Sequence, residues 1–175
     1  MSRVIKINLD SSVDNGLSEL EDYMSELNDK LATFIDTLVS SGVSVAGLCV
    51  SSTKGDSKRP DVIYKVDSKG DIIKAEIAIV GEDVLFVEFG AGIAYNTGAQ
   101  HPQAGEFGYG IGTFPSKHPP NRAINPGYWY YSEHDSVGAT VRTRSIGTEA
   151  TMPIYNASET MRNEIITKAV DAFRS

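Results

Sequence analysis

The clearest pattern of hydrophobic and polar positions lies early in the chain, where large apolar residues recur at intervals of three and four. This spacing places side chains on one face of a helix, so it predicts an amphipathic helix over residues 17–38. Gly42 is expected to end or kink this helix, and the stretch from Val43 to Val50 favours a further helical turn over a strand. The apolar face consists of Leu17, Leu20, Met24, Leu27, Leu31, Phe34 or Ile35, and Leu38.

The opposite face of this predicted helix is acidic, with Lys30 nearly alone against the carboxylates. One interpretation is an ordinary solvated helix surface. The other is a surface that faces DNA without binding it, because a row of carboxylates keeps a polyanion from sticking. The sequence leaves both interpretations open. The acidic residues are Glu19, Asp22, Glu26, Asp29 and Asp36.

The middle of the chain predicts a β-hairpin. Two β-rich runs, Val62–Val66 and Ile72–Val80, flank a short polar turn that contains Gly70, which is the usual hairpin signature. The next apolar run, Val84–Phe89, is too short for periodicity to decide between a third strand and a short buried helix.

The last part of the chain predicts a second hairpin and a final helix. Tyr128–Tyr131 and Ala139–Arg144 are plausible strands, and the hairpin that they form could add to the first sheet. Thr151 can cap the helix that follows, and Pro153 suits its first turn. We therefore predict an α+β fold, in which a small, mostly antiparallel sheet is packed by a long N-terminal helix and a C-terminal helix. Residues 1–175 are expected to form a single domain.

A long segment rich in glycine and proline, residues 90–127, interrupts these elements. Segments of this length without regular structure are usually functional or disordered, and the aromatic residues in this one argue against a mere spacer. We interpret it as an extended arm within the domain that becomes ordered against a partner. Its candidate interaction residues are Tyr95, His101, Phe107, Tyr109 and Phe114.

Composition narrows the class of protein. The 175 residues are 41% hydrophobic and 22% charged, with one cysteine and a net charge of −7. All the excess acid lies in residues 1–90, and such a field repels nucleic acid and anionic membranes. The sequence has no continuous run of about 18 apolar residues, so it does not predict a membrane span. The N-terminus lacks an apolar signal core, so we expect a cytoplasmic origin.

Candidate catalytic chemistry is sparse. The stretch Gly108–Gly112 lacks the glycine spacing and the following helix of a dinucleotide loop, and the three histidines have no metal-ligand spacing. We expect no cofactor and no metal. Glu88 stands out because it interrupts an apolar run. A buried carboxylate must be paired or hydrogen-bonded, so a bond to backbone amides or to an arginine is favoured over a catalytic acid. The aromatic run Tyr128–Tyr131 is interpreted as core or interface rather than a stacking platform for bases.

The order of several motifs resembles a known family. These motifs are Phe-Val-Glu-Phe-Gly-Ala-Gly-Ile at residues 86–93, a glycine-rich loop with a His-Pro pair, Gly-Tyr-Trp-Tyr-Tyr at 127–131, and Met-Pro-Ile-Tyr-Asn-Ala at 152–157 before the closing helix. The series resembles the neck or tail-completion proteins, also called head–tail joining proteins, of long-tailed bacteriophages. The resemblance spans residues 17–173, and residues 98–125 form a longer loop than the shortest family versions have.

The resemblance implies a structural virion protein with no enzymatic activity. Such a protein is assembled in the bacterial cytoplasm and forms a homo-oligomeric ring, six copies by family expectation, at the head–tail junction. Its partners would be the connector or stopper proteins and the tail terminator or tail tube, and DNA would pass through without specific binding. Carried over to this chain, the motif that shapes the core and the loop exit is Phe86, Glu88, Phe89, Gly90 and Gly92.

Two alternatives stay open at this point. One is a tail terminator that caps the tail tube instead of bridging the neck. The other, from a different class, is a small hydrolase with Glu88 or His134 in its active site, although the sequence offers no paired acid and base at a credible spacing.

Overall fold

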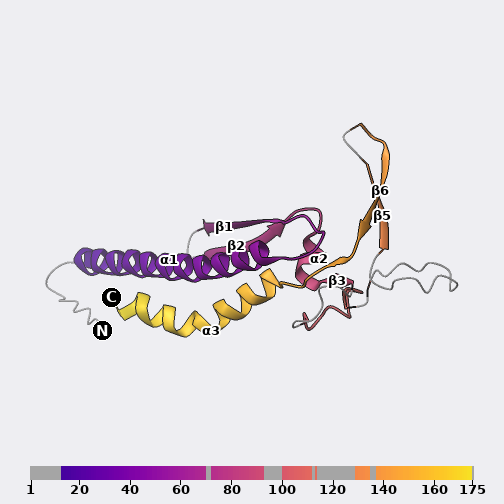
Figure 1. The fold of residues 1–175 in the computed structure, drawn as a ribbon. Helices are drawn as coiled ribbons and strands as arrows, with labels where there is room; N and C mark the ends of the chain where they lie inside the picture. The colour runs from indigo at the N-terminus through magenta and orange to yellow at the C-terminus, as the bar shows by residue number, and fades with distance from the viewer. Residues whose placement is uncertain are drawn as a thin grey trace.

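The computed structural model describes residues 13–69, 72–92, 100–111, 113, 129–134 and 137–174. Two long helices dominate it, α1 (Val13–Ser52) and α3 (Pro153–Arg174), and they pack against each other more extensively than any other pair of elements. The aromatic rings of Phe34 and Phe173 lie 6.4 Å apart, while Thr53 at the other end meets Thr151. The two helices are therefore antiparallel, as Figure 1 shows.

Helix α1 runs without interruption through Gly42, so the expectation that this glycine ends the helix is wrong. The reason for the glycine is packing. A Cβ atom at Gly42 would lie 2.6 Å from Cδ1 of Ile77 and 2.8 Å from Sδ of Met161. Position 42 is thus a point of close approach between α1, the hairpin and α3, and an added side chain there would require Ile77 and Met161 to shift.

The predicted first hairpin is confirmed. Strands β1 (Asp61–Lys69) and β2 (Ile72–Val80) pair antiparallel, with a register that runs from Asp61 opposite Val80 to Lys69 opposite Ile72. Both strands pack on α1. Because alternate side chains of a strand point to opposite faces, Ile77 and Ile79 share the half-buried face with Ile73.

The ambiguous run Val84–Phe89 forms a short helix, α2, and not a third strand. After it comes a small sheet with the strand order β4–β3–β7, made of Gly110–Ile111, Ala91–Gly92 and Gly147–Thr148. Strand β3 is parallel to β4 and antiparallel to β7. This sheet ties together three segments that lie far apart in the sequence.

The second hairpin is present as β5 (Trp129–His134) and β6 (Thr140–Ser145). It forms a two-stranded sheet of its own and does not extend the first sheet. The α+β class is confirmed, and the strands that the structure describes are divided among three small sheets. Figure 1 shows an elongated molecule with the helical pair and the first hairpin on one side and the β5–β6 hairpin at the far end.

By length and composition, α1 is also a candidate membrane span. The helical segment Asn15–Ser52 contains a window with a mean hydropathy of 1.5, of which 28% is buried in the fold. The sequence did not indicate this candidate span, because serines, threonines and glycines separate the apolar residues and leave no uninterrupted apolar run. A core helix has the same composition, and α3 and the hairpin both pack on α1.

Candidate functional site

The most buried carboxylate among the described residues belongs to Glu88 and lies at the start of α3. Helix α2 directs its side chain to the first turn of α3, where Oε2 accepts a hydrogen bond from the amide N–H of Ile154 and Oε1 accepts one from Tyr155, both at 2.9 Å. The first amides of a helix have no partner within the helix, and its dipole favours an anion there. Glu88 therefore caps the N-terminus of α3, although it belongs to another helix, α2.

This arrangement confirms that Glu88 bonds to backbone amides, and it corrects the expected cap. The hydroxyl of Thr151, which we predicted to cap α3, lies instead 3.0 Å from the hydroxyl of Thr53 at the end of α1. Pro153 is the first residue of α3, as predicted. The cap and the Thr53–Thr151 contact together fasten the start of α3 to α2 and to α1.

The structure brings His101 against Glu88, a pairing that no sequence spacing indicates. Nε2 of His101 lies 3.5 Å from Oε1 of Glu88, and both side chains are almost fully buried. Nδ1 accepts a hydrogen bond from the amide of Gln103 at 3.1 Å. The proton of a neutral His101 ring is therefore placed on Nε2, which faces the carboxylate. The imidazole ring also makes T-shaped contacts with the rings of Phe89 and Tyr155, at centroid distances of 4.5 and 5.0 Å.

Around this pair lies an aromatic cluster. The ring of Phe89 contacts Phe107 and Tyr109, at centroid distances of 5.2 and 5.7 Å, and Phe86 meets Tyr109 edge-on at 5.6 Å. Residues 102–108 are a series of turns whose inner residue, Ala104, is buried. The cluster joins α2 to the glycine-rich segment.

The expectation of an extended arm therefore needs correction for residues 100–111. His101 and Tyr109 point into the cluster, and Phe107 contacts Phe89 while still 57% exposed. This part of the segment packs on its own domain. The other two candidate arm residues, Tyr95 and Phe114, lie outside the described residues.

Gly90 and Gly92, the glycines of the motif, both have φ of +76°, a conformation that favours glycine. A Cβ atom at Gly90 would also lie 2.9 Å from the Cβ of Ala150. The carbonyl of Gly90 accepts a hydrogen bond from the amide of Gly110 at 3.0 Å. The five motif residues therefore surround one junction, where α2, the sheet β4–β3–β7 and the start of α3 meet.

The polar side chains of this junction contact backbone amides and each other. Both carboxylate oxygens of Glu88 accept amide hydrogen bonds, and both ring nitrogens of His101 face a polar partner. The other residue considered for catalysis, His134, ends β5 in a separate sheet. Within the described ranges, no group of three or more histidine, cysteine or acidic side chains is placed to hold a metal ion.

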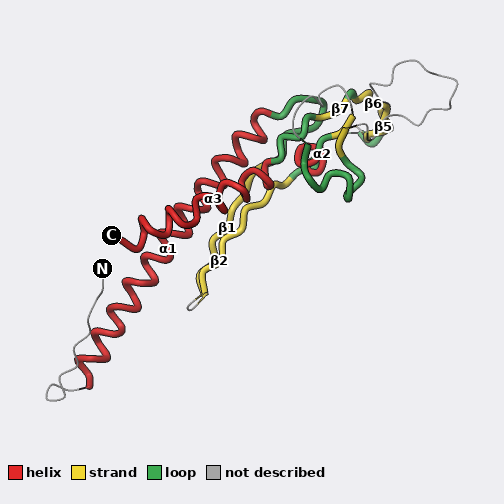
Figure 2. The backbone as a smooth tube through the Cα atoms, turned by 90° about the horizontal axis from the view of Figure 1, so that it is seen from below, coloured by secondary structure: helices red, strands yellow, loops and turns green. Residues whose placement is uncertain are grey.

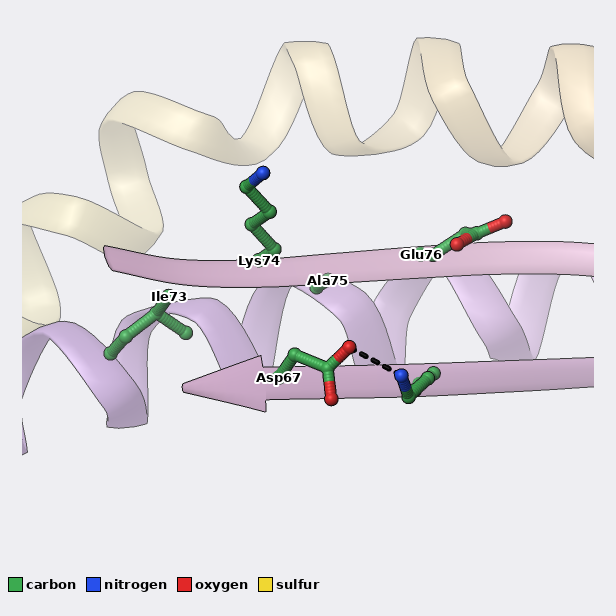
Figure 3. A pocket seen from close by; sticks show the side chains of 6 residues that line it. Asp67, Ile73, Lys74, Ala75 and Glu76 are labelled. Atoms are coloured by element: carbon green, nitrogen blue, oxygen red, sulfur yellow. Dashed lines mark hydrogen bonds and ion pairs between the residues drawn. The ribbon is translucent and has the colours of Figure 1, made fainter. Parts of the chain in front are cut away.

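Two hollows, of about 520 and 460 Å³, lie on the turn end of the first hairpin rather than near Glu88. Figure 3 shows Lys74 and Glu76 extending from β2 on the side of α3, while Asp67 on β1 is paired with Lys65. That ion pair raises the pKa of Lys65 through the hydrogen bond and the charge of Asp67. Both partners are exposed, so this hairpin surface lacks the enclosed apolar lining of a typical small-molecule site.

The five carboxylates of the predicted acidic face are all exposed on α1. Glu26 pairs with Lys30 at 3.3 Å along the helix, a spacing at which side chains of a helix are neighbours.

Comparison of the chain with models of known protein families, with curated proteins and with solved structures finds no match.

Proposed function

We propose that this protein is a structural subunit of the head–tail junction of a long-tailed bacteriophage. The observation that carries the proposal is the convergence of the motif at residues 86–93 on one buried junction, where Glu88 joins α2 to the start of α3. The resemblance assigns this motif the role of shaping the core and the loop exit. A carboxylate whose oxygens both hold backbone amides suits that role better than turnover of a substrate.

Surface composition supports an assembly role. Large apolar side chains are exposed along the first half of α1, on both strands of the first hairpin and on α3. Extended apolar patches on a soluble protein usually mark contacts with other proteins. In the proposed ring, of six copies by family expectation, these surfaces would face neighbouring subunits, the connector or stopper proteins, and the tail terminator or tail tube.

The proposal gives the acidic face of α1 the role of lining the DNA passage. Carboxylates that line a passage repel the DNA phosphates and prevent the DNA from sticking as it moves. Glu19, Asp22, Asp29 and Asp36 are exposed on α1, so a ring that turns this helix inward would present them to the DNA. DNA would pass without base-specific contacts, and the protein would remain in the virion.

The test is cryo-electron microscopy of particles of the phage that encodes this chain, combined with a nonsense mutation in its gene. We expect a ring of this protein at the head–tail junction, and DNA-filled heads with separate tails in the mutant. Joined, infectious particles from the mutant would refute the proposal. A ring on the end of isolated mature tails would instead identify the tail terminator.

A further inference from the structure

The apolar residues in the first half of α1 follow a strict seven-residue repeat. In the positions a to g of such a repeat, the a positions hold Leu17, Met24, Leu31 and Leu38, and the d positions hold Leu20, Leu27 and Phe34. A helix with apolar a and d positions pairs with another helix along that seam. The repeat stops after Leu38, where the buried positions become Val39, Gly42, Ala46 and Val50.

Helix α3 covers only the last part of this seam. The contact between Phe34 and Phe173 lies at the C-terminal end of α3, and Figure 2 shows α1 continuing beyond that end. The next seam residue, Leu31, is half-buried. The four seam residues beyond it towards the N-terminus are exposed, with Leu17 at 53% and Met24 at 51%. In the part of the chain that the structure describes, no element covers Leu17, Leu20, Met24 or Leu27.

The residues that flank the exposed seam are compatible with an identical helix as its partner. In parallel pairs, a g residue of one helix faces the following e residue of the other. For two copies of this chain the facing residues would be Gly16 with Glu21, Tyr23 with Asn28, and Lys30 with Ile35. None of these pairs brings like charges together. Apart from Glu21 at an e position, the acidic residues of this stretch occupy the outward c and f positions, where two parallel copies hold them apart: Glu19, Asp22, Glu26, Asp29 and Asp36.

We infer that the exposed seam Leu17–Leu27 is a self-association site whose occupant is the same seam of a second copy, parallel and in register. The seam continues a helix–helix contact that the fold already makes with α3, and its flanks admit an identical helix without repulsion. This inference concerns how copies meet and does not depend on the phage assignment. It names a two-fold contact between identical helix faces, which is distinct from the head-to-tail contacts that close a ring.

Disulfide cross-linking of the full chain tests the geometry. Cys49 is the only cysteine, so a Cys49→Ser background carries either Leu17→Cys at an a position or Asp22→Cys at an f position. Disulfides require Cα atoms about 4.4–6.8 Å apart, which a parallel, in-register seam provides at position 17 and not at position 22. We expect covalent dimers with Leu17→Cys and none with Asp22→Cys. Equal cross-linking of both variants, or none of either, would overturn the inference.

Matched charge substitutions test the energetics by analytical ultracentrifugation. Leu20→Glu places a carboxylate in the seam, and Ser18→Glu places the same side chain on the outer face. Both positions are exposed in the single chain, so circular dichroism should show both variants folded. Because two leucines lose their burial in each dimer, we expect Leu20→Glu to weaken association by about 100-fold or more, and Ser18→Glu to change it little. A monomeric wild-type chain, or equal weakening by both variants, would refute the inference, as would a wild-type chain that associates only with lipid vesicles.

Discussion

Oε1 of Glu88 accepts a hydrogen bond from the amide of Tyr155 at 2.9 Å, across a separation of 67 residues in the sequence. A local side chain caps most helices. In this protein the acceptor for the amides of Ile154 and Tyr155 comes from a different helix, α2. The buried carboxylate therefore couples the motif at residues 86–93 to the packing of α3 along α1.

Removal of this carboxylate should destabilise the fold. Glu88→Ala leaves the amides of Ile154 and Tyr155 without their acceptor in a buried place, and each unsatisfied group costs about 1–3 kcal/mol. We expect urea denaturation to show a loss of about 3 kcal/mol in the free energy of unfolding. Glu88→Gln, which keeps one acceptor oxygen, should lose less. Glu106→Ala, at an exposed position, is the control and should stay within about 0.5 kcal/mol of wild type.

Two glycines of α1 should respond in opposite directions to alanine. Alanine stabilises a helix interior by about 0.5–1 kcal/mol relative to glycine, and Gly47→Ala should show that gain because nothing lies within 4 Å of the new Cβ. Gly42→Ala places its Cβ against Ile77 and Met161, so we expect a net loss of about 1–3 kcal/mol from overpacking. Thermal unfolding measures both. A stabilised Gly42→Ala variant would contradict the close approach of the three elements.

The small sheet should depend on Gly147. Its φ is +115°, and an added Cβ would lie 2.4 Å from the carbonyl oxygen of Ala91. Gly147→Ala should therefore disrupt the pairing of β3 with β7 and lower the midpoint of thermal unfolding. Gly105→Ala, with nothing within 4 Å, is the matched control and should leave the midpoint nearly unchanged. If both variants melt alike, the observed approach of β7 to β3 is not tight.

The exposed pair of Lys58 and Glu82, 2.5 Å apart, makes a prediction about pH. The hydrogen bond and the charge of Lys58 lower the pKa of Glu82 below its ordinary value of 4.5. Any stabilisation from this pair is complete above the ordinary pKa and is lost as the pH falls through the lowered one. Lys58→Met should raise the pKa of Glu82 towards 4.5 in an NMR titration. An unchanged pKa would show that solvent screens the pair completely.

Periodicity predicted the elements whose side chains carry a strong local pattern. The spacing of leucines indicated the first half of α1, and the β-rich runs around Gly70 indicated the β1–β2 hairpin, because each pattern reflects which side of the element is buried. Glycine was harder to interpret. At Gly42 the local preference for ending a helix is outweighed by the close approach of Ile77 and Met161, which no neighbouring residue reveals.

Local sequence patterns were enough to predict two amphipathic helices, two hairpins and a carboxylate in an apolar run that needs hydrogen-bond partners. Those properties follow from local propensity and from the cost of burying a charge. No sequence pattern indicates which amides donate hydrogen bonds to Glu88, that His101 lies against it, or that part of the glycine-rich segment packs inward; these appear in the folded chain. These contacts join residues far apart in the chain, and they are set by how α2, α3 and the small sheet meet in space.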